Sequence, residues 1–240
     1  MGELDEVLEK LEADNPGHGV KEAVEFYENS NLDEEQRKNL AYGIGVGYFK
    51  IGSYDKTLSW LDKTNDPRRW LLSGYALQQM DEFEAAARAF SIAAEKNPEQ
   101  RLEAKLLEAQ VLLLAEKIDS AAGILGKLLE EENLSRQMEK EALLTRARAA
   151  LAGDKPRRAR PWLEKVFAAD SKSEFAMEAV FYLIQVEEKA GQITKALEYA
   201  RWLKENGSDE NWRGVASEYL RRLHGHRRNQ KGALRDYDFL

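Results

Sequence analysis

Residues 67–98 read PRRWLLSGYALQQMDEFEAAARAFSIAAEKNP, and this stretch decides the fold of the chain. It places a small residue at Gly74 and another at Ala86, with large apolar residues around them. Two antiparallel helices approach closely only where small side chains lie at their crossing, so the order predicts a helix–turn–helix hairpin. Asp66 and Pro67 are expected to cap its first helix. One hairpin cannot bury its own apolar face, so the chain must repeat it.

The repeat is visible from residue 23 onward. The small residue of the second helix recurs at Ala23, Thr57, Ala86, Ala121, Ala159 and Ala196, at intervals of 34, 29, 35, 38 and 37 residues. The interval of 29 predicts a shortened second helix around residues 58–63. The longer intervals predict longer turns, of which residues 153–156 are one.

The order of residues in 67–98 and a period close to 34 resemble the tetratricopeptide repeat (TPR) family. The resemblance implies an all-α fold, a right-handed superhelical solenoid of about six TPR-like helical hairpins plus a C-terminal capping helix. The array is expected over residues 1–205, with a weak first unit over 1–33. The capping helix is expected over residues 206–223, and a basic, flexible tail over 224–240.

The resemblance also implies a binding surface, because members of this family bind an extended peptide or a helix on the face made by the first helix of each hairpin. Transferring the register gives a largely apolar groove, with Asn39 beside it. Its residues are Tyr42, Val46, Phe49, Arg68, Leu71, Tyr75, Leu106, Gln110, Leu144 and Arg148. If the register is shifted by one residue, these side chains belong to the core instead.

The groove predicts a non-enzymatic scaffold or adaptor that binds an apolar peptide or amphipathic helix of another protein. A co-chaperone role is not expected, since the clamp of that subset needs Lys and Asn where this chain has Tyr42 and Val46. The alternative is a structural assembly subunit of a multiprotein complex. Such a subunit would use its termini and its outer face, on which Trp60 and Trp162 are expected.

The termini differ in charge. Residues 1–35 hold 12 Asp/Glu and 2 Lys, whereas residues 221–240 hold 6 Lys/Arg and 2 Asp. This asymmetry predicts possible self-association between the acidic N-terminus and the basic C-terminal tail. The last five residues, Asp236 to Leu240, are a second candidate for docking, and an inert tail is the third reading.

Composition excludes several other functions. The chain has no Cys and only 3 His, so no catalytic, cofactor or metal site is expected. His224 and His226 alone make a weak metal pair. A pI near 5.3, with no aromatics among the basic residues of the tail, argues against nucleic acid. No apolar run is long enough to span a membrane. A cytoplasmic location is expected, or a periplasmic one had a signal or anchor been removed.

Overall fold

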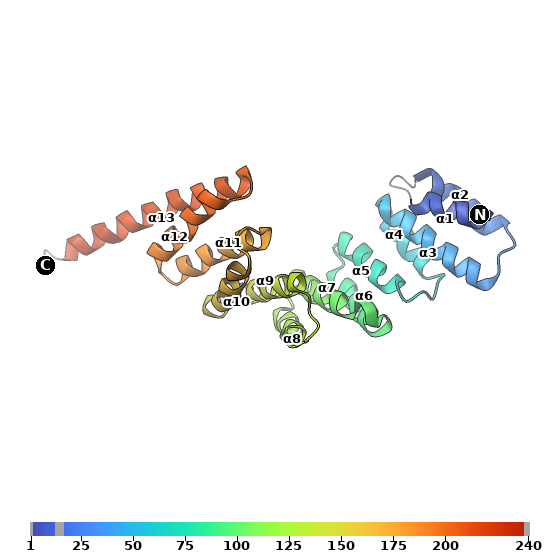
Figure 1. Ribbon diagram of the computed structural model, residues 1–240, viewed down its shortest axis with the longest axis horizontal. Helices are drawn as coiled ribbons and strands as arrows, with labels where there is room; N and C mark the ends of the chain where they lie inside the picture. Colours follow the sequence, from blue (N-terminus) through green and yellow to red (C-terminus); the bar gives the residue numbers. More distant parts are fainter. Residues whose placement is uncertain (1, 13–16, 238–240) are drawn as a thin grey trace. The chain divides into compact units, whose positions relative to one another are not determined.

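The computed structural model describes residues 2–12 and 17–237, with side chains placed for 2–11 and 17–225. These residues form thirteen α-helices and no strand, which confirms the all-α expectation (Figure 1). In chain order the helices make six pairs followed by α13. They are α1 Glu3–Glu12, α2 Gly17–Asn29, α3 Glu34–Lys50, α4 Tyr54–Leu61, α5 Arg69–Gln79, α6 Phe83–Lys96, α7 Arg101–Leu114, α8 Ile118–Leu128, α9 Arg136–Ala152, α10 Pro156–Ala169, α11 Glu174–Lys189, α12 Ile193–Asn206 and α13 Glu210–Tyr237.

The chain divides into two compact units, Met1–Lys117 and Ile118–Leu240. In the first unit, one core cluster lies among α1 to α4 and another among α5 to α7. In the second unit, one cluster lies among α9 to α11 and another among α11 to α13. Each unit therefore has its own buried core.

The predicted register is confirmed by burial. The six small residues of the second helices, Ala23, Thr57, Ala86, Ala121, Ala159 and Ala196, are all 0% exposed. Thr57 satisfies its hydroxyl by donating to the Ser53 carbonyl oxygen at 3.2 Å. The helix α4 has only 8 residues, as the interval of 29 predicted.

Five hairpin turns share one geometry. Each contains a residue with positive φ that ends the first helix: Gly52, Asp81, Glu116, Asp154 and Gly191. The next residue then donates its backbone N–H five residues back, as from Ser53 to Tyr48 at 2.9 Å and from Gln192 to Glu187 at 2.8 Å. This is the Schellman arrangement, which satisfies carbonyls at the helix end. The turns are thus equal in length, and the expectation that later hairpins carry longer turns is wrong.

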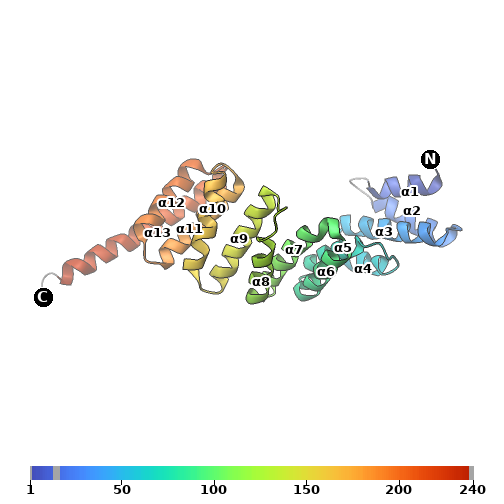
Figure 2. The same ribbon diagram turned by 60° about the horizontal axis from the view of Figure 1, so that its bottom comes forward.

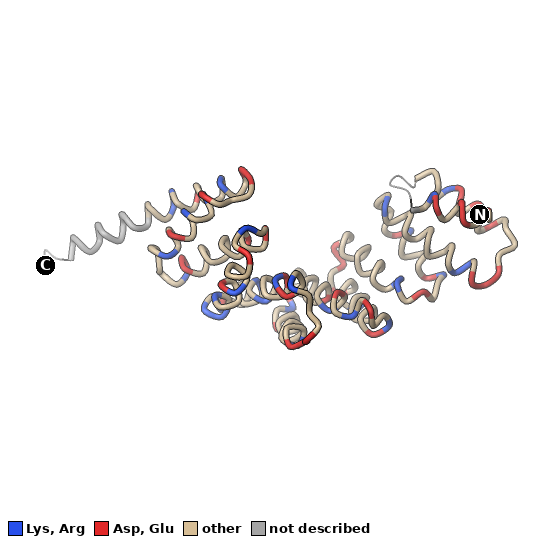
Figure 3. Tube along the Cα trace, viewed as in Figure 1, with Lys and Arg blue, Asp and Glu red and all other residues tan. Residues whose placement is uncertain are grey.

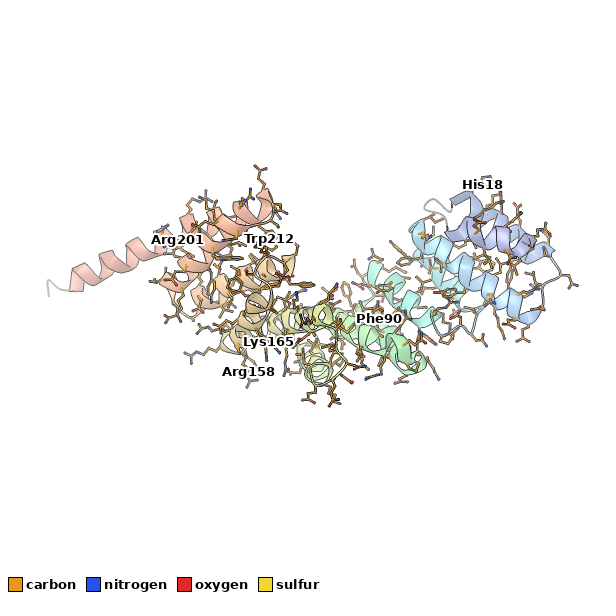
Figure 4. The ribbon with its side chains drawn as sticks, viewed as in Figure 1. His18, Phe90, Arg158, Lys165, Arg201 and Trp212 are labelled. Carbon is orange, nitrogen blue, oxygen red and sulfur yellow. The ribbon has the colours of Figure 1, made fainter. Side chains whose placement is uncertain are left out.

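Glycines of the first helices let the second helices approach. A Cβ on Gly74 would lie 2.5 Å from the ring of Phe90, which Figure 4 labels, so Gly74 faces Phe90 rather than Ala86. A Cβ on Gly45 would lie 2.9 Å from Leu61. Close packing within these two hairpins therefore fixes the glycines at positions 45 and 74.

The start of α5 differs from the expectation. The helix begins at Arg69, and Asp66 and Pro67 form a turn before it. Asp66 Oδ1 accepts the backbone N–H of Arg68 at 2.8 Å, so its carboxylate stabilises this turn instead of capping the helix.

The last helix, α13, has 28 residues and continues through the segment expected as a tail, as far as Tyr237. In the second unit it runs back along α12 and continues past the N-terminal end of that helix (Figure 2). The sequence after Leu223 contains no proline to stop a helix. The last three residues of the candidate docking segment, 238–240, lie outside the described residues.

Candidate functional site

A cavity in the first unit brings together several predicted groove residues. It has a volume of about 300 Å3 and lies among α1, α3 and the turn before α5. Its lining consists of Leu8, Leu11, Asn39, Tyr42, Gly43, Val46 and Arg68. The volume is at the low end for small-molecule pockets, about 300–1,000 Å3, and suits one or two side chains of a partner.

The wall contributed by α1 was missed in the prediction of the groove. Leu8 and Leu11 reach the cavity from α1, and Gly43 of α3 lies against them. A Cβ on Gly43 would lie 3.0 Å from Leu8, so the two helices approach closely here. The spacing of Leu4, Leu8 and Leu11 along one helical face is the sequence signal that could have found this wall.

Arg68 forms the polar side of the cavity. Its Nε and Nη2 donate to the carboxylate of Asp66, at 3.0 Å and 2.6 Å. Its guanidinium lies 4.6 Å from the ring centroid of Tyr42. The hydrogen bonds from Arg68 hold the pKa of Asp66 below its usual range. Burial raises the pKa of the Tyr42 phenol, so this hydroxyl stays protonated at neutral pH.

Three further predicted residues of the first unit are half-buried on the first helices. Phe49 packs on Tyr54 with ring centroids 5.5 Å apart. Tyr75 packs edge-on against Phe90 at 5.4 Å, and its hydroxyl donates to Glu103 at 3.4 Å. Gln110 lies on α7 and is half-buried. None of the three lines the cavity.

Three predicted groove residues are core residues. Leu71 is 9% exposed, Leu106 is 5% exposed and Leu144 is 3% exposed. Leu71 packs in the cluster of α5 to α7, and Leu144 packs in the cluster of α9 to α11. These three side chains shape the interior beneath the first helices and do not line a groove, although the register of the small residues is as predicted.

In the second unit, Arg148 of α9 is exposed and faces Glu178 of α11. Burial raises the pKa of Glu178, while the Arg148 charge and a hydrogen bond from Tyr182 oppose this rise. Burial likewise raises the pKa of Tyr182.

Aromatic side chains gather around the middle of α11. The ring of Phe181 lies 5.2 Å from Tyr182, 6.1 Å from Trp212 and 5.9 Å from Tyr219. Trp212, which Figure 4 labels, lies at the start of α13, and its indole N–H donates to Glu174 at 3.0 Å. These contacts fix the capping helix on α11.

The outer-face tryptophans differ in exposure. Trp60 is only 8% exposed and packs edge-on against Tyr27 at 4.9 Å. Trp162 is half-buried, with the Arg146 guanidinium 4.6 Å from its ring. Trp60 is therefore a core residue, and the expectation that it lies on an outer contact surface is wrong.

Among the described residues, no three His, Cys, Asp or Glu side chains come together as metal ligands. His18 is exposed on α2, with Nδ1 3.0 Å from Glu22 (Figure 4). His226 and the distal basic side chains lie outside the residues whose side chains are placed. In the described part of the chain, no helix is both long and apolar enough to cross a membrane.

Solved structures share this fold. RapI in its apo form is similar with a TM-score of 0.73 and 13% identity, over 93% of this chain and 72% of that chain. The apo form of the quorum sensor NprR from B. thuringiensis is similar with a TM-score of 0.60 and 12% identity, over 85% of this chain and 63% of that chain. TTC0263, a TPR protein of Thermus thermophilus, is similar with a TM-score of 0.53 and 14% identity, over 76% of this chain and 98% of that chain.

No curated protein matches the chain in sequence. The family model of the tetratricopeptide repeat matches residues 71–133 and 144–211, which is more than half of the chain. With the helical hairpins, the buried small residues and the shared turns, this match shows that the chain belongs to the tetratricopeptide repeat family.

Proposed function

We propose that this protein is a non-enzymatic interaction scaffold whose cavity in the first unit receives an apolar side chain of a partner peptide or helix. The observation that carries the proposal is the joint lining by Tyr42, Val46 and Arg68, with Leu8 and Leu11 opposite. Tetratricopeptide repeats generally serve as protein-interaction scaffolds, and the cavity supplies the concave apolar surface such binding needs.

Different residues of the cavity contribute different interactions to the binding of a partner. Leu8, Leu11 and Val46 supply apolar walls, and burial of a partner side chain against them provides the affinity. Arg68 is held over Tyr42 by Asp66, so its orientation is fixed before a partner arrives. Asn39 adds an amide that can exchange hydrogen bonds with a peptide backbone.

The test is selection of peptides from a displayed random library on the full chain, followed by affinity measurement with Val46→Trp. The indole fills the cavity, so selected peptides should lose binding by about ten- to hundredfold, the value of one buried apolar side chain. The matched control is Leu114→Trp, which adds the same side chain at an exposed position of α7.

Equal binding by the two tryptophan variants would exclude the cavity as the binding site. Far-UV circular dichroism must show the same helicity for both variants. If the indole disturbs folding, Val46→Phe fills the cavity with a smaller ring. A quorum sensor is among the proteins of similar fold, so recognition of a partner molecule is compatible with this architecture.

The second candidate function, a structural assembly subunit, loses one of its predicted contact residues. Its outer-face contact through Trp60 is removed by burial of that side chain. Its predicted contact through the termini does not involve Trp60, and it depends on α1, α2 and α13.

A further inference from the structure

The first hairpin carries a groove with acidic walls. An open groove of about 330 Å3 lies between α1 and α2, and it is lined by Glu3, Glu6, Lys10, Glu22 and Glu25 beside the apolar side chains of Val7 and Phe26. Figure 3 shows the acidic residues that follow one another along α1 and α2. The groove thus combines negative charge with apolar surface.

The charge of this groove is only partly balanced within the hairpin. Lys10 donates to Glu22 at 2.5 Å, and His18 lies 3.0 Å from the same carboxylate. Within the described residues, Glu3, Glu6 and Glu25 form no ion pair. Unbalanced charge that lines a concavity attracts a segment of opposite charge.

The helix α13 offers such a segment. Its described packing against the second unit comes from residues 212–223, including the buried Ala216 and Leu223. The helix continues for 14 residues beyond Leu223, a length of about 21 Å at 1.5 Å per residue. In the sequence, Arg227, Lys231 and Leu234 recur at the interval of one helical face.

The two halves of the chain are opposite in charge balance. Residues 1–117 hold 23 Asp/Glu and 14 Lys/Arg, whereas residues 118–240 hold 20 and 22. Like ends of two copies therefore repel each other, and only unlike ends attract. This favours contacts between unlike ends of two copies over contacts between like ends.

We propose that the distal half of α13 from one copy docks in the α1–α2 groove of a second copy. Attraction between the basic sequence of this segment and the carboxylates of Glu3, Glu6 and Glu25 drives the contact. Each contact of this kind leaves one groove and one helix end unoccupied, so assembly grows into open chains or closes into rings. The contact is independent of the cavity proposed above for partner peptides.

The first measurement is the mass of the full chain by size-exclusion chromatography with light scattering. At about 20 mM salt the mass should exceed the 27.4 kDa of a monomer and rise with concentration. At about 500 mM salt it should return to the monomer value, because exposed ion pairs are screened. A monomer at low salt, which includes a helix docked within its own chain, overturns the proposal.

Charge reversal identifies the surfaces. Arg227→Glu with Lys231→Glu, and separately Glu6→Lys with Glu25→Lys, should each raise the apparent Kd at least about tenfold. The matched controls are Arg157→Glu with Arg158→Glu on the exposed part of α10, and Glu95→Lys with Glu99→Lys (Figure 4 labels Arg158). The controls should keep the wild-type mass; a loss equal to that of the test variants overturns the proposal.

Mixing the two test variants separates docking from misfolding. The acidic helix of one variant fits the basic groove of the other, so an equimolar mixture should regain mass that neither variant shows alone. A mixture that stays monomeric while both variants retain wild-type circular dichroism overturns the proposal. Deletion of residues 226–240 should also leave a monomer, and persistent association after that deletion overturns it equally.

Discussion

At the scale of single residues, two ion pairs differ in what surrounds them. Arg160 Nη2 donates to Glu187 Oε2 at 2.7 Å, and Glu187 is 1% exposed, so this pair ties α10 to α11 inside the second unit. Arg68 and Asp66 lie at the surface of the cavity, with the Arg68 side chain 58% exposed. Loss of Arg160 would leave the buried Glu187 carboxylate without this partner, whereas loss of Asp66 would leave the exposed Arg68 guanidinium solvated.

Asp66 should make stability depend on pH. Its folded pKa lies below the ordinary value of 3.8, so its carboxylate stabilises the folded state above that value. This contribution disappears as the pH falls through the folded pKa. Asp66→Asn should therefore lower the free energy of unfolding by about 1 kcal/mol at neutral pH, and the deficit should shrink below about pH 4.

Urea unfolding at a series of pH values from about 6 to about 3 measures this difference. Asp62→Asn is the control, because Asp62 is exposed and makes no ion pair among the described residues. A deficit for Asp66→Asn that stays constant down to the lowest pH would contradict the assignment of Asp66 as an ionised partner of Arg68.

At the scale of the elements, the hairpin turns show how one backbone shape is encoded by different residues. Gly52 and Gly191 adopt φ of 75° and 73°, and Asp81, Glu116 and Asp154 adopt φ of 59°, 59° and 52°. A left-handed conformation costs a residue with a Cβ about 1 kcal/mol, and Asp tolerates it better than Glu. Glu116 therefore has the least suitable side chain of the five.

Glu116→Gly should raise the free energy of unfolding by up to about 1 kcal/mol, and Gly191→Ala should lower it by a similar amount. No atom lies within 4 Å of a Cβ added at Gly191, so the expected loss comes from the backbone alone and not from a clash. Chemical denaturation of both variants measures the two effects. The two variants must change the free energy of unfolding in opposite directions. A Gly191→Ala variant more stable than the wild type would contradict the left-handed conformation of Gly191.

At the scale of the whole molecule, contacts are local in sequence. The helix pairs with substantial contact are neighbours or next neighbours along the chain, such as α6 with α7 and α1 with α3. Each unit has its own core clusters. In such arrays each repeat is stabilised chiefly by its neighbours, so damage is expected to stay near its origin.

Gly74→Ala tests this locality. The added Cβ meets the Phe90 ring at 2.5 Å, which should cost about 1–3 kcal/mol through overpacking. Hydrogen exchange should rise in α5 and α6 and remain unchanged in α10 to α13. Gly123→Ala, which meets no atom within 4 Å, should stabilise α8 by about 0.5–1 kcal/mol. Equal loss of protection in both units after Gly74→Ala would show a single cooperative structure instead.

The sequence by itself determined the hairpins and their register. The intervals of 29, 35, 38 and 37 residues between the small residues from Thr57 to Ala196 are also the intervals between the positive-φ residues from Gly52 to Gly191. The spacing of the small residues depends on residues near one another within each hairpin, so a local pattern is sufficient to predict the repeat and its register.

Only the tertiary structure decided which side chains of that register lie at a surface. Leu71, Leu106 and Leu144 follow the same helical pattern as Tyr42 and Val46, yet neighbouring helices bury the three leucines. Leu8 and Leu11 form a wall of the cavity because α1 packs against Gly43 of α3. Exposure depends on which helix lies alongside, and the apolar pattern within one helix does not specify that contact.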